Sequence, residues 1–309
     1  MKKAVVTGGA GFIGSHLAEE LVNHGYQVII LDDFSTGKKE NIDPLLESRP
    51  VELIEGSITD LSLLQKVFQS VDKVFHLAAV PSVPRSIKNP QASHEVNATG
   101  TNNVLLAARD NGVGKVIYAS SSSVYGDTPT VPKKETMSPN PQSPYAVAKL
   151  TGEYYCQVFY RVYGLTTVSL RYFNVYGARQ DPNSQYAAVI PLFIKRISEG
   201  KPPYIFGDGK QTRDFTFVKD VVEANILVAE SEKMGVFNIG RGERVPINQL
   251  VRLISKIMEV NVAPVYKKMR KGDVLHSLAD ISRAGDFGYH PKYSLEEGLR
   301  EIIRSFRPD

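Results

Sequence analysis

The sequence has few of the features that would place it in several classes of protein. It contains a single cysteine, Cys156, so an intrachain disulfide and a zinc site built on several thiolates are both excluded. No apolar run approaches the ~18 residues that a membrane span needs, and the apolar stretch after Lys3 is too short for a signal peptide. We therefore expect a cytoplasmic protein without a membrane partner.

The chain also lacks a strong charge of either sign. Its 309 residues carry 37 Lys and Arg against 33 Asp and Glu, and the net charge of +4 is spread along the chain. Nucleic-acid binding needs a clustered basic face, so we expect no nucleic-acid partner. The six histidines show no spacing typical of metal ligands, and we expect no metal site.

The first half of the sequence alternates short β-branched runs with amphipathic segments. Such runs are typical of strands buried on both faces of a parallel sheet. Their alternation with helical segments predicts an α/β fold, a Rossmann-type doubly wound parallel sheet. Strands are expected at 4–6, 28–31, 51–54, 74–77 and 116–118, and helices at 13–22, 61–68, 104–108 and 146–163.

After about Arg171 the pattern changes. Prolines and glycines become dense, strand candidates shorten, and helical runs return at 218–229, 247–258 and 295–306. This predicts a smaller, mixed C-terminal substrate lobe over residues 174–309. Residues 1–173 would form the sheet domain, with segments near 211–240 returning to it.

A glycine-rich turn follows the first expected strand and opens the first expected helix. Gly8, Gly11 and Gly14 let a pyrophosphate approach the backbone at the helix N-terminus. Asp32, 18 residues past Gly14, ends the second strand, where its carboxylate would bind the adenosine ribose hydroxyls. We therefore predict that residues 1–173 bind NAD rather than NADP. The alternative is a structural glycine turn with an exposed aspartate.

A second feature is the pair Tyr145 and Lys149, four residues apart at the start of a helix that Pro144 opens. This spacing places both side chains on one helical face. A phenol with a pKa near ~10 needs about 4 kcal/mol of stabilisation of the phenolate to ionise near neutrality. Lys149 and the positive nicotinamide ring could supply it, with a hydroxyl of the run Ser120–Ser123 sharing the proton. The alternative is packing for Tyr145 and turn capping for the serines.

Segments spread over about 300 residues resemble the extended short-chain dehydrogenase/reductases, in particular the NAD-dependent sugar-nucleotide epimerase/dehydratase group. Within that group the sequence is most similar to UDP-hexose 4-epimerases, especially those acting on UDP-N-acetylglucosamine. The resemblance is carried by residues 77–79, 82–86, 143–145, 170–174, 179–183, 213–215 and 272–274.

This resemblance implies a role for each matching position. Tyr145 would be the catalytic base, Lys149 would hold the nicotinamide ribose, Ser121 would be the catalytic serine, and Ser122 would touch the sugar. The residues lining NAD would be Gly8, Gly11, Phe12, Ile13, Gly14, Asp32, Asp33, Ser35, Thr36, Gly37, Ser57, Ile58, Leu77, Ala78, Ala79, Asn97, Tyr145, Lys149 and Tyr172. Those holding the UDP-sugar would be Ser82, Arg85, Ser121, Ser122, Asn174, Ala188, Val189, Phe206, Arg213, Arg270, Asp273 and Ser277.

The sequence departs from the family's pattern in two places. Ser57 stands where the family usually has an acid that contacts adenine. Ala187 and Ala188 stand where many UDP-galactose 4-epimerases carry two asparagines beside uracil. The first departure weakens the expected adenine contact, and neither changes the chemistry.

Ser122 and Ser123 bear on which reaction of the family is expected. Dehydratases of the group carry Asp-Glu at these positions to expel the C6 hydroxyl, and decarboxylases tend to have Glu at the second. A serine hydroxyl is too weak an acid for that step. The resemblance therefore implies C4 epimerisation through a transient 4-keto sugar.

Ser277 bears on the sugar. At this position, four residues after Asp273, related epimerases that accept only plain hexoses have tyrosine, whereas a small residue leaves room for a 2-acetamido group. Serine implies UDP-GlcNAc/UDP-GalNAc interconversion, with UDP-Glc/UDP-Gal as further substrates. The alternatives are UDP-glucuronate 4-epimerase, with Arg85 facing the C6 carboxylate, and a non-catalytic NAD-sensing protein on the same fold. The helices expected at 97–111 and 146–163 would form the family's usual homodimer.

Overall fold

The computed structural model describes residues 2–48, 51–182, 188–269 and 274–306. A seven-stranded sheet forms its centre, and all neighbouring strands in it are parallel. The strands are β1 (Lys3–Thr7), β2 (Gln27–Asp32), β3 (Val51–Glu55), β4 (Lys73–His76), β5 (Lys115–Ser121), β6 (Thr167–Tyr172) and β11 (Gly235–Ile239). Their order across the sheet is β11-β6-β5-β4-β1-β2-β3. The predicted doubly wound, Rossmann-type fold is confirmed.

Alternation of side chains along the strands divides the core into two layers. Val5 and Ile29 pack with α3 (Leu61–Val67), α6 (Gly100–Asp110) and α7 (Pro144–Tyr163) on one face of the sheet. Val6 and Ile30 pack with α1 (Phe12–Asn23) and α9 (Val218–Glu230) on the other. Because both faces are covered by helices, most central positions of the strands are apolar, which is why the strands read as β-branched runs. Buried polar residues such as Arg171 on β6 are exceptions.

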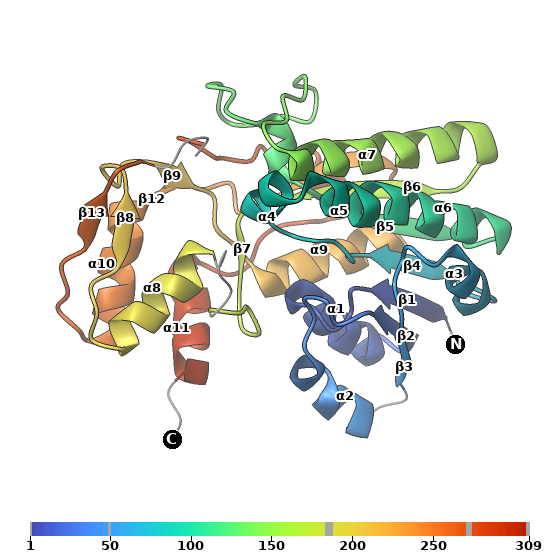
Figure 1. Ribbon diagram of the computed structural model, residues 1–309, viewed down its shortest axis with the longest axis horizontal. Helices are drawn as coiled ribbons and strands as arrows, with labels where there is room; N and C mark the ends of the chain where they lie inside the picture. The colour runs from blue at the N-terminus through green and yellow to red at the C-terminus, as the bar shows by residue number, and fades with distance from the viewer. Residues whose placement is uncertain (1, 49–50, 183–187, 270–273, 307–309) are drawn as a thin grey trace.

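Several short helices were not predicted. α2 (Asp43–Ser48) follows the 3₁₀ turn η1 (Lys39–Asn41). α4 (Val83–Lys88) and α5 (Pro90–His94) precede a π-helical turn, η2 (Glu95–Thr99), that runs into α6. A further 3₁₀ turn, η3 (Ser122–Tyr125), follows β5 directly. In Figure 1, α4 and α5 lie beside the first half of α7.

The C-terminal lobe lies beside the sheet domain, on the left in Figure 1. Its strands pair two by two, both parallel and antiparallel, so the predicted mixed lobe is confirmed. The pairs are β7 (Val175–Tyr176) with β10 (Thr216–Phe217), β9 (Thr212–Arg213) with β12 (Val245–Pro246), and β8 (Tyr204–Phe206) with β13 (Val265–Lys267). The lobe's helices are α8 (Val189–Ser198), α10 (Ile247–Met258), η4 (Ala284–Phe287) and α11 (Leu295–Phe306).

The chain returns to the sheet domain through α9 and β11, which lie within residues 218–239. The domain boundary at residue 173 stays a prediction. Among the described residues, no helix has both the length and the apolar character that crossing a membrane requires.

Candidate active site

The glycine turn between β1 and α1 is shaped by close backbone contacts. Gly8 has a φ of +71°, and a Cβ there would lie 2.7 Å from the backbone nitrogen of Ala78. A Cβ on Gly14 would lie 2.1 Å from the carbonyl oxygen of Gly8. Gly11 is the N-cap of α1, and no side chain caps that helix start. The uncapped N–H groups and the cradle without Cβ atoms fit the pyrophosphate of a dinucleotide.

Asp32 is buried where β2 ends beside this turn. Its carboxylate accepts hydrogen bonds of 2.9 Å from the backbone N–H groups of Ala10 and Phe34. Burial raises the pKa of the Asp32 carboxyl, and these two hydrogen bonds act in the opposite direction. Gly37 packs on the carboxylate, since a Cβ there would lie 2.7 Å from Oδ1. Asp32 is thus held beside the turn, as the ribose contact requires.

The loop after β2 also carries a cation, Lys38, that the prediction of NAD rather than NADP from Asp32 did not take into account. Its ammonium lies 3.3 Å from Glu40 and 3.7 Å from Asp181. These two carboxylates partly neutralise it. The structure therefore leaves the preference for NAD intact.

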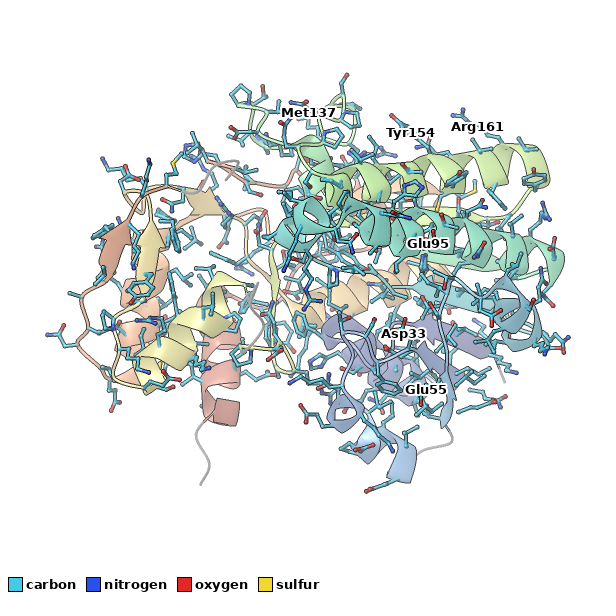
Figure 2. The ribbon with its side chains drawn as sticks, in the orientation of Figure 1. Asp33, Glu55, Glu95, Met137, Tyr154 and Arg161 are labelled. Atoms are coloured by element: carbon cyan, nitrogen blue, oxygen red, sulfur yellow. The ribbon has the colours of Figure 1, made fainter. Side chains whose placement is uncertain are left out.

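Other residues predicted to line NAD lie around the same strand ends. Asp33 accepts a hydrogen bond of 2.6 Å from the Ser35 hydroxyl, and in Figure 2 it lies near Glu55. The Ser57 hydroxyl accepts one of 3.0 Å from Thr59. Leu77, Ala78 and Ala79 follow β4, and Ile58 is buried against Gly100.

Asn97 is buried in η2, and its amide holds the chain that follows β4. Its oxygen accepts from the backbone N–H of Val80 at 2.8 Å, and its nitrogen donates to the Val80 carbonyl at 3.3 Å. Asn97 therefore fixes the chain just after Leu77–Ala79. Asn97 thus supports the segment that was predicted to line NAD, and its own contact with NAD stays a prediction.

Tyr145 lies in the first turn of α7, a helix with clear signals at both ends. The Ser143 hydroxyl caps it by accepting from Ala146 N–H at 3.2 Å, Pro144 occupies N1, and Gly164 ends it with a φ of +73°. Burial raises the pKa of Tyr145 to about 12, while a hydrogen bond with the Ser121 hydroxyl acts in the opposite direction.

Lys149 is buried one turn further along α7. Its ammonium donates to the Ala119 carbonyl at 2.8 Å and lies 5.9 Å from the centre of the Tyr145 ring and 5.0 Å from that of Tyr118. Burial lowers the pKa of Lys149 to about 8. The ammonium is thus mostly protonated at neutral pH and adjacent to the phenol. The predicted grouping of Tyr145, Lys149 and Ser121 is present in the structure.

The serine run forms the turn that faces these residues. Ser121 ends β5 and caps η3, accepting from the Ser123 N–H at 3.2 Å. Its register partner on β6 is Tyr172, whose hydroxyl donates to Asn225 at 2.9 Å. The Ser123 hydroxyl is buried and has no hydrogen-bond partner among the described residues.

The C-terminal lobe brings further predicted residues to this edge. Ser277 is buried, and its N–H donates to the Thr212 carbonyl at 3.1 Å, which places it beside Arg213 on β9. The neighbouring Leu275 N–H reaches Asp127, just after η3, at 3.4 Å. The lobe segment with Ser277 therefore runs close to the serine turn.

The remaining substrate positions lie on several elements. Asn174, with a φ of +29°, donates to the Asp214 carbonyl at 3.1 Å. Ser82 caps α4, which carries the half-buried Arg85. Ala188 and Val189 start α8, and Phe206 ends β8. Arg270 and Asp273 lie outside the described residues.

Two buried polar groups near the site were not predicted. Glu153, one turn past Lys149, forms a buried ion pair with Arg171 at 2.7 Å. His76, at the end of β4, lies between the hydroxyls of Thr7 at 2.8 Å and Thr101 at 3.0 Å. Burial, with the Lys149 charge, lowers the pKa of His76 to about 3. The i+4 spacing from Lys149 is the one sequence signal that pointed to Glu153.

Within the described ranges, no three His, Cys, Asp or Glu side chains gather as metal ligands would. The arrangement instead joins a groove for a dinucleotide to a phenol, an ammonium and a hydroxyl.

A protein with these features is a nucleotide-dependent enzyme of the Rossmann type, and the comparisons are more specific. The profile of the NAD dependent epimerase/dehydratase family matches residues 4–240. The chain belongs to this family, and its cofactor is NAD.

Three solved structures show how closely the whole chain follows the family. The UDP-N-acetylglucosamine 4-epimerase of Methanobrevibacter ruminantium, in complex with UDP-N-acetylmuramic acid, is 44% identical with a TM-score of 0.96, covering 99% of this chain and 98% of that one. The UDP-glucose 4-epimerase of Thermotoga maritima with UDP-glucose is 42% identical, with a TM-score of 0.94 and 98% of both chains covered. The UDP-glucuronic acid 4-epimerase of Bacillus cereus, with UDP-glucuronic acid and NAD, is 36% identical, with a TM-score of 0.91, covering 99% of this chain and 100% of that one.

Proposed function

We propose that this chain is an NAD-dependent UDP-sugar 4-epimerase that interconverts UDP-N-acetylglucosamine and UDP-N-acetylgalactosamine, with UDP-glucose and UDP-galactose as secondary substrates. The observation that carries the proposal is the grouping of Tyr145, Lys149 and Ser121 at the carboxyl edge of the sheet. Membership of the family and the 4-epimerase activity named for the three neighbours support it.

The cofactor groove assigns a role to each end of the dinucleotide. The N-terminus of α1 would hold the pyrophosphate, Asp32 the adenosine ribose, and Lys149 the nicotinamide ribose. When bound, NAD accepts a hydride from C4 of the sugar and later returns it.

The proton of the C4 hydroxyl goes to Tyr145. Burial opposes ionisation of this phenol, whereas the Lys149 ammonium and the Ser121 hydroxyl both favour the phenolate. The phenolate takes the proton, directly or through Ser121, and gives it back after the sugar has turned its other face. The UDP must stay bound meanwhile, and Arg213 suits its diphosphate because a guanidinium donates two hydrogen bonds at once.

The serine turn disfavours dehydration of the 4-keto sugar. Elimination of the C6 hydroxyl needs a proton donor near the sugar, and Ser122 and Ser123 offer only hydroxyls. The keto sugar therefore returns to a hexose, as a 4-epimerase requires.

Replacement of Tyr145 by phenylalanine tests the chemistry. Loss of a positioned acid–base group should lower kcat by roughly 10²- to 10⁴-fold, with NAD still bound. Tyr160→Phe is the matched control, because Tyr160 is an exposed tyrosine of the same helix. Unchanged turnover in Tyr145→Phe would refute the assignment. Absence of turnover of any UDP-sugar by the NAD-loaded native protein would favour the NAD-sensing alternative.

Replacement of Ser277 by tyrosine tests the sugar preference. The phenol would fill the space expected for the 2-acetamido group, so the ratio of UDP-GlcNAc to UDP-glucose turnover should fall. Activity on UDP-glucose serves as the internal control for folding. An unchanged ratio contradicts this role for Ser277.

UDP-glucuronate is the second candidate substrate, favoured by the Bacillus cereus neighbour and by the half-buried Arg85 on α4. A panel of UDP-sugars given to the native enzyme distinguishes the two. Faster turnover of UDP-glucuronate, with loss of that activity in Arg85→Ala, would favour this alternative.

We also propose a homodimer formed through the outer face of α7. Val147, Tyr154, Val158 and Val162 are 47–64% exposed there, and Figure 2 shows Tyr154 directed away from the sheet. A row of exposed apolar side chains on one helix is typical of an interface between copies. Light scattering should give a dimer for the native chain and a monomer for Val158→Glu.

A further inference from the structure

Glu153 is a buried carboxylate directly beside the catalytic residues. Tyr145, Lys149 and Glu153 follow one another at intervals of four residues, so they share the face of α7 that packs on β5 and β6. Glu153 is 1% exposed and Arg171, its partner on β6, is 3% exposed. Both charges of the pair thus lie in the interior.

The Glu153 carboxylate contacts both β5 and β6, one residue before the strand ends that face the site. Its Oε1 accepts from the Ser120 hydroxyl at 2.5 Å and from Arg171 Nε at 2.9 Å, and its Oε2 accepts from Arg171 Nη2 at 2.7 Å. Ser120 and Arg171 are direct partners in the β5–β6 ladder, and the next pair is Ser121 with Tyr172. Glu153 therefore fastens α7 to the two strands one residue before the catalytic serine.

Arg171 extends the network to the serine turn. Its guanidinium lies 4.6 Å from the centre of the Tyr125 ring, and the Tyr125 hydroxyl donates to Asn238 on β11 at 2.7 Å. Tyr125 ends η3. One ion pair thus connects the helix with Lys149, the turn with Ser121 and the edge strand of the sheet.

Stability alone is a weak reason for such a pair. The loss of hydration of two buried charges offsets much of their attraction, so apolar residues of similar size often stabilise a protein as well or better. Breaking the pair by removing one partner, in contrast, leaves an uncompensated charge in the interior. Because stability alone does not explain the buried Glu153–Arg171 pair, we infer that the pair has a role in the site.

The surroundings of Lys149 indicate that role. The other titratable groups that face it are His76 on β4, Tyr118 on β5, and Tyr145 and Cys156 on α7. His76 has a pKa lowered to about 3, and Cys156 one raised to about 12, both by burial, while burial raises the pKa of both tyrosines. His76, Tyr118 and Cys156 are therefore neutral at pH 7, which leaves Glu153 as the carboxylate among these groups.

We propose that Glu153 is a positioning residue for the epimerisation: paired with Arg171, its carboxylate fixes α7 on the β5–β6 ladder and keeps Lys149 protonated beside Tyr145. This inference rests on the proposed roles of Tyr145 and Lys149. Glu153 touches neither cofactor nor substrate and acts through Lys149 and Ser120.

The test compares NAD-loaded enzyme variants over a range from about pH 6 to about pH 10. Glu153→Gln removes the charge and keeps an acceptor for Ser120. The double variant Glu153→Leu/Arg171→Met removes both charges and avoids an unpaired buried cation. Asp220→Asn is the matched control, because Asp220 is a 1% exposed carboxylate that accepts from Lys292 N–H at 2.8 Å, on α9 across the sheet.

The alkaline limb of kcat reports the loss of the Lys149 proton. Glu153→Gln removes a negative charge about one helical turn away and leaves the Arg171 cation unpaired, so it should move this limb to lower pH by about one unit. The double variant removes both charges, and it should move the limb less. We expect KM to change less than kcat, and Asp220→Asn to lower the melting temperature without moving the limb.

An alkaline limb at the native pH in folded Glu153→Gln would overturn the inference. An equal shift in Asp220→Asn would also overturn it, because the shift would then reflect destabilisation alone. These outcomes leave the proposed function standing, since that depends on Tyr145→Phe.

Discussion

Replacement of Lys149 by methionine should stabilise the fold at neutral pH while it abolishes turnover. Burial lowers the pKa of Lys149 from 10.5 to about 8. At about 1.36 kcal/mol per pH unit, this difference of about 2.5 units means that keeping the buried ammonium protonated costs the native state about 3 kcal/mol. Methionine fills a similar volume and carries no charge.

The gain in stability from Lys149→Met is smaller than about 3 kcal/mol, because the native ammonium also donates to the Ala119 carbonyl at 2.8 Å. A buried carbonyl that loses its donor costs about 1–3 kcal/mol. We therefore expect the variant to be more stable than the native chain by about 1 kcal/mol at pH 7.

The pH dependence gives the sign of the effect. The unfolded chain keeps the lysine proton up to about pH 10.5, whereas the native state releases it near pH 8. The unfolded state thus binds more protons between these values, so the native protein gains stability as pH rises through them. Lys149→Met lacks this gain, and its advantage should vanish and reverse by about pH 10.

Urea unfolding of the NAD-free proteins at pH 7 and pH 10 measures the effect, since bound NAD would add its own stabilisation. Lys201→Met is the control, because Lys201 has a side chain that is 58% exposed. A variant less stable than the native chain at pH 7, or a difference that does not change with pH, would refute the reasoning.

Two further predictions concern the scaffold. Gly14→Ala should abolish NAD retention, because its Cβ would lie 2.1 Å from the Gly8 carbonyl oxygen, and cofactor release on denaturation would show it. Gly112→Ala is the control, because nothing lies within 4 Å of its Cβ: this variant should retain NAD, and its positive φ should lower the free energy of unfolding by only about 1 kcal/mol. Lys115→Met should lower the free energy of unfolding by about 1 kcal/mol at pH 7 without changing kcat per folded molecule. Its ammonium donates at 2.7 Å and 2.6 Å to two carbonyls at the end of α9, and each carbonyl that loses its donor costs about 2 kcal/mol. Burial lowers the pKa of Lys115 to about 8, so removal of the charge returns about 3 kcal/mol of this loss. A urea midpoint equal to that of the native chain would contradict the second prediction.

The sheet and the cofactor groove could be predicted from the sequence because their signals are local. The β-branched runs, the glycine turn and Asp32 each lie within a few residues of the elements they define. Tyr145 and Lys149 were predictable for the same reason, since the i, i+4 spacing places them together whatever the helix packs against.

Pairings between distant segments could not be predicted in this way. Glu153 and Arg171 are 18 residues apart, and only the register of β6 on β5 brings them together. The contact of the Asn97 amide with Val80 likewise depends on how η2 packs. Helix α8 precedes a segment rich in proline and glycine, and its apolar face becomes evident only against the lobe's core.

The register of the β5–β6 ladder links these local and distant features. Successive side chains of a strand point to opposite faces of a sheet. Ser120 and Arg171 therefore point toward α7 and Glu153, while the next residue on β6, Tyr172, points to the other side, where its hydroxyl donates to Asn225 of α9. A slip of β6 by one residue would turn Arg171 to the opposite face of the sheet and leave Glu153 without its cation. The ion pair that fastens α7 to this ladder thus opposes a slip of β6 that would disturb the strand end beside the catalytic serine.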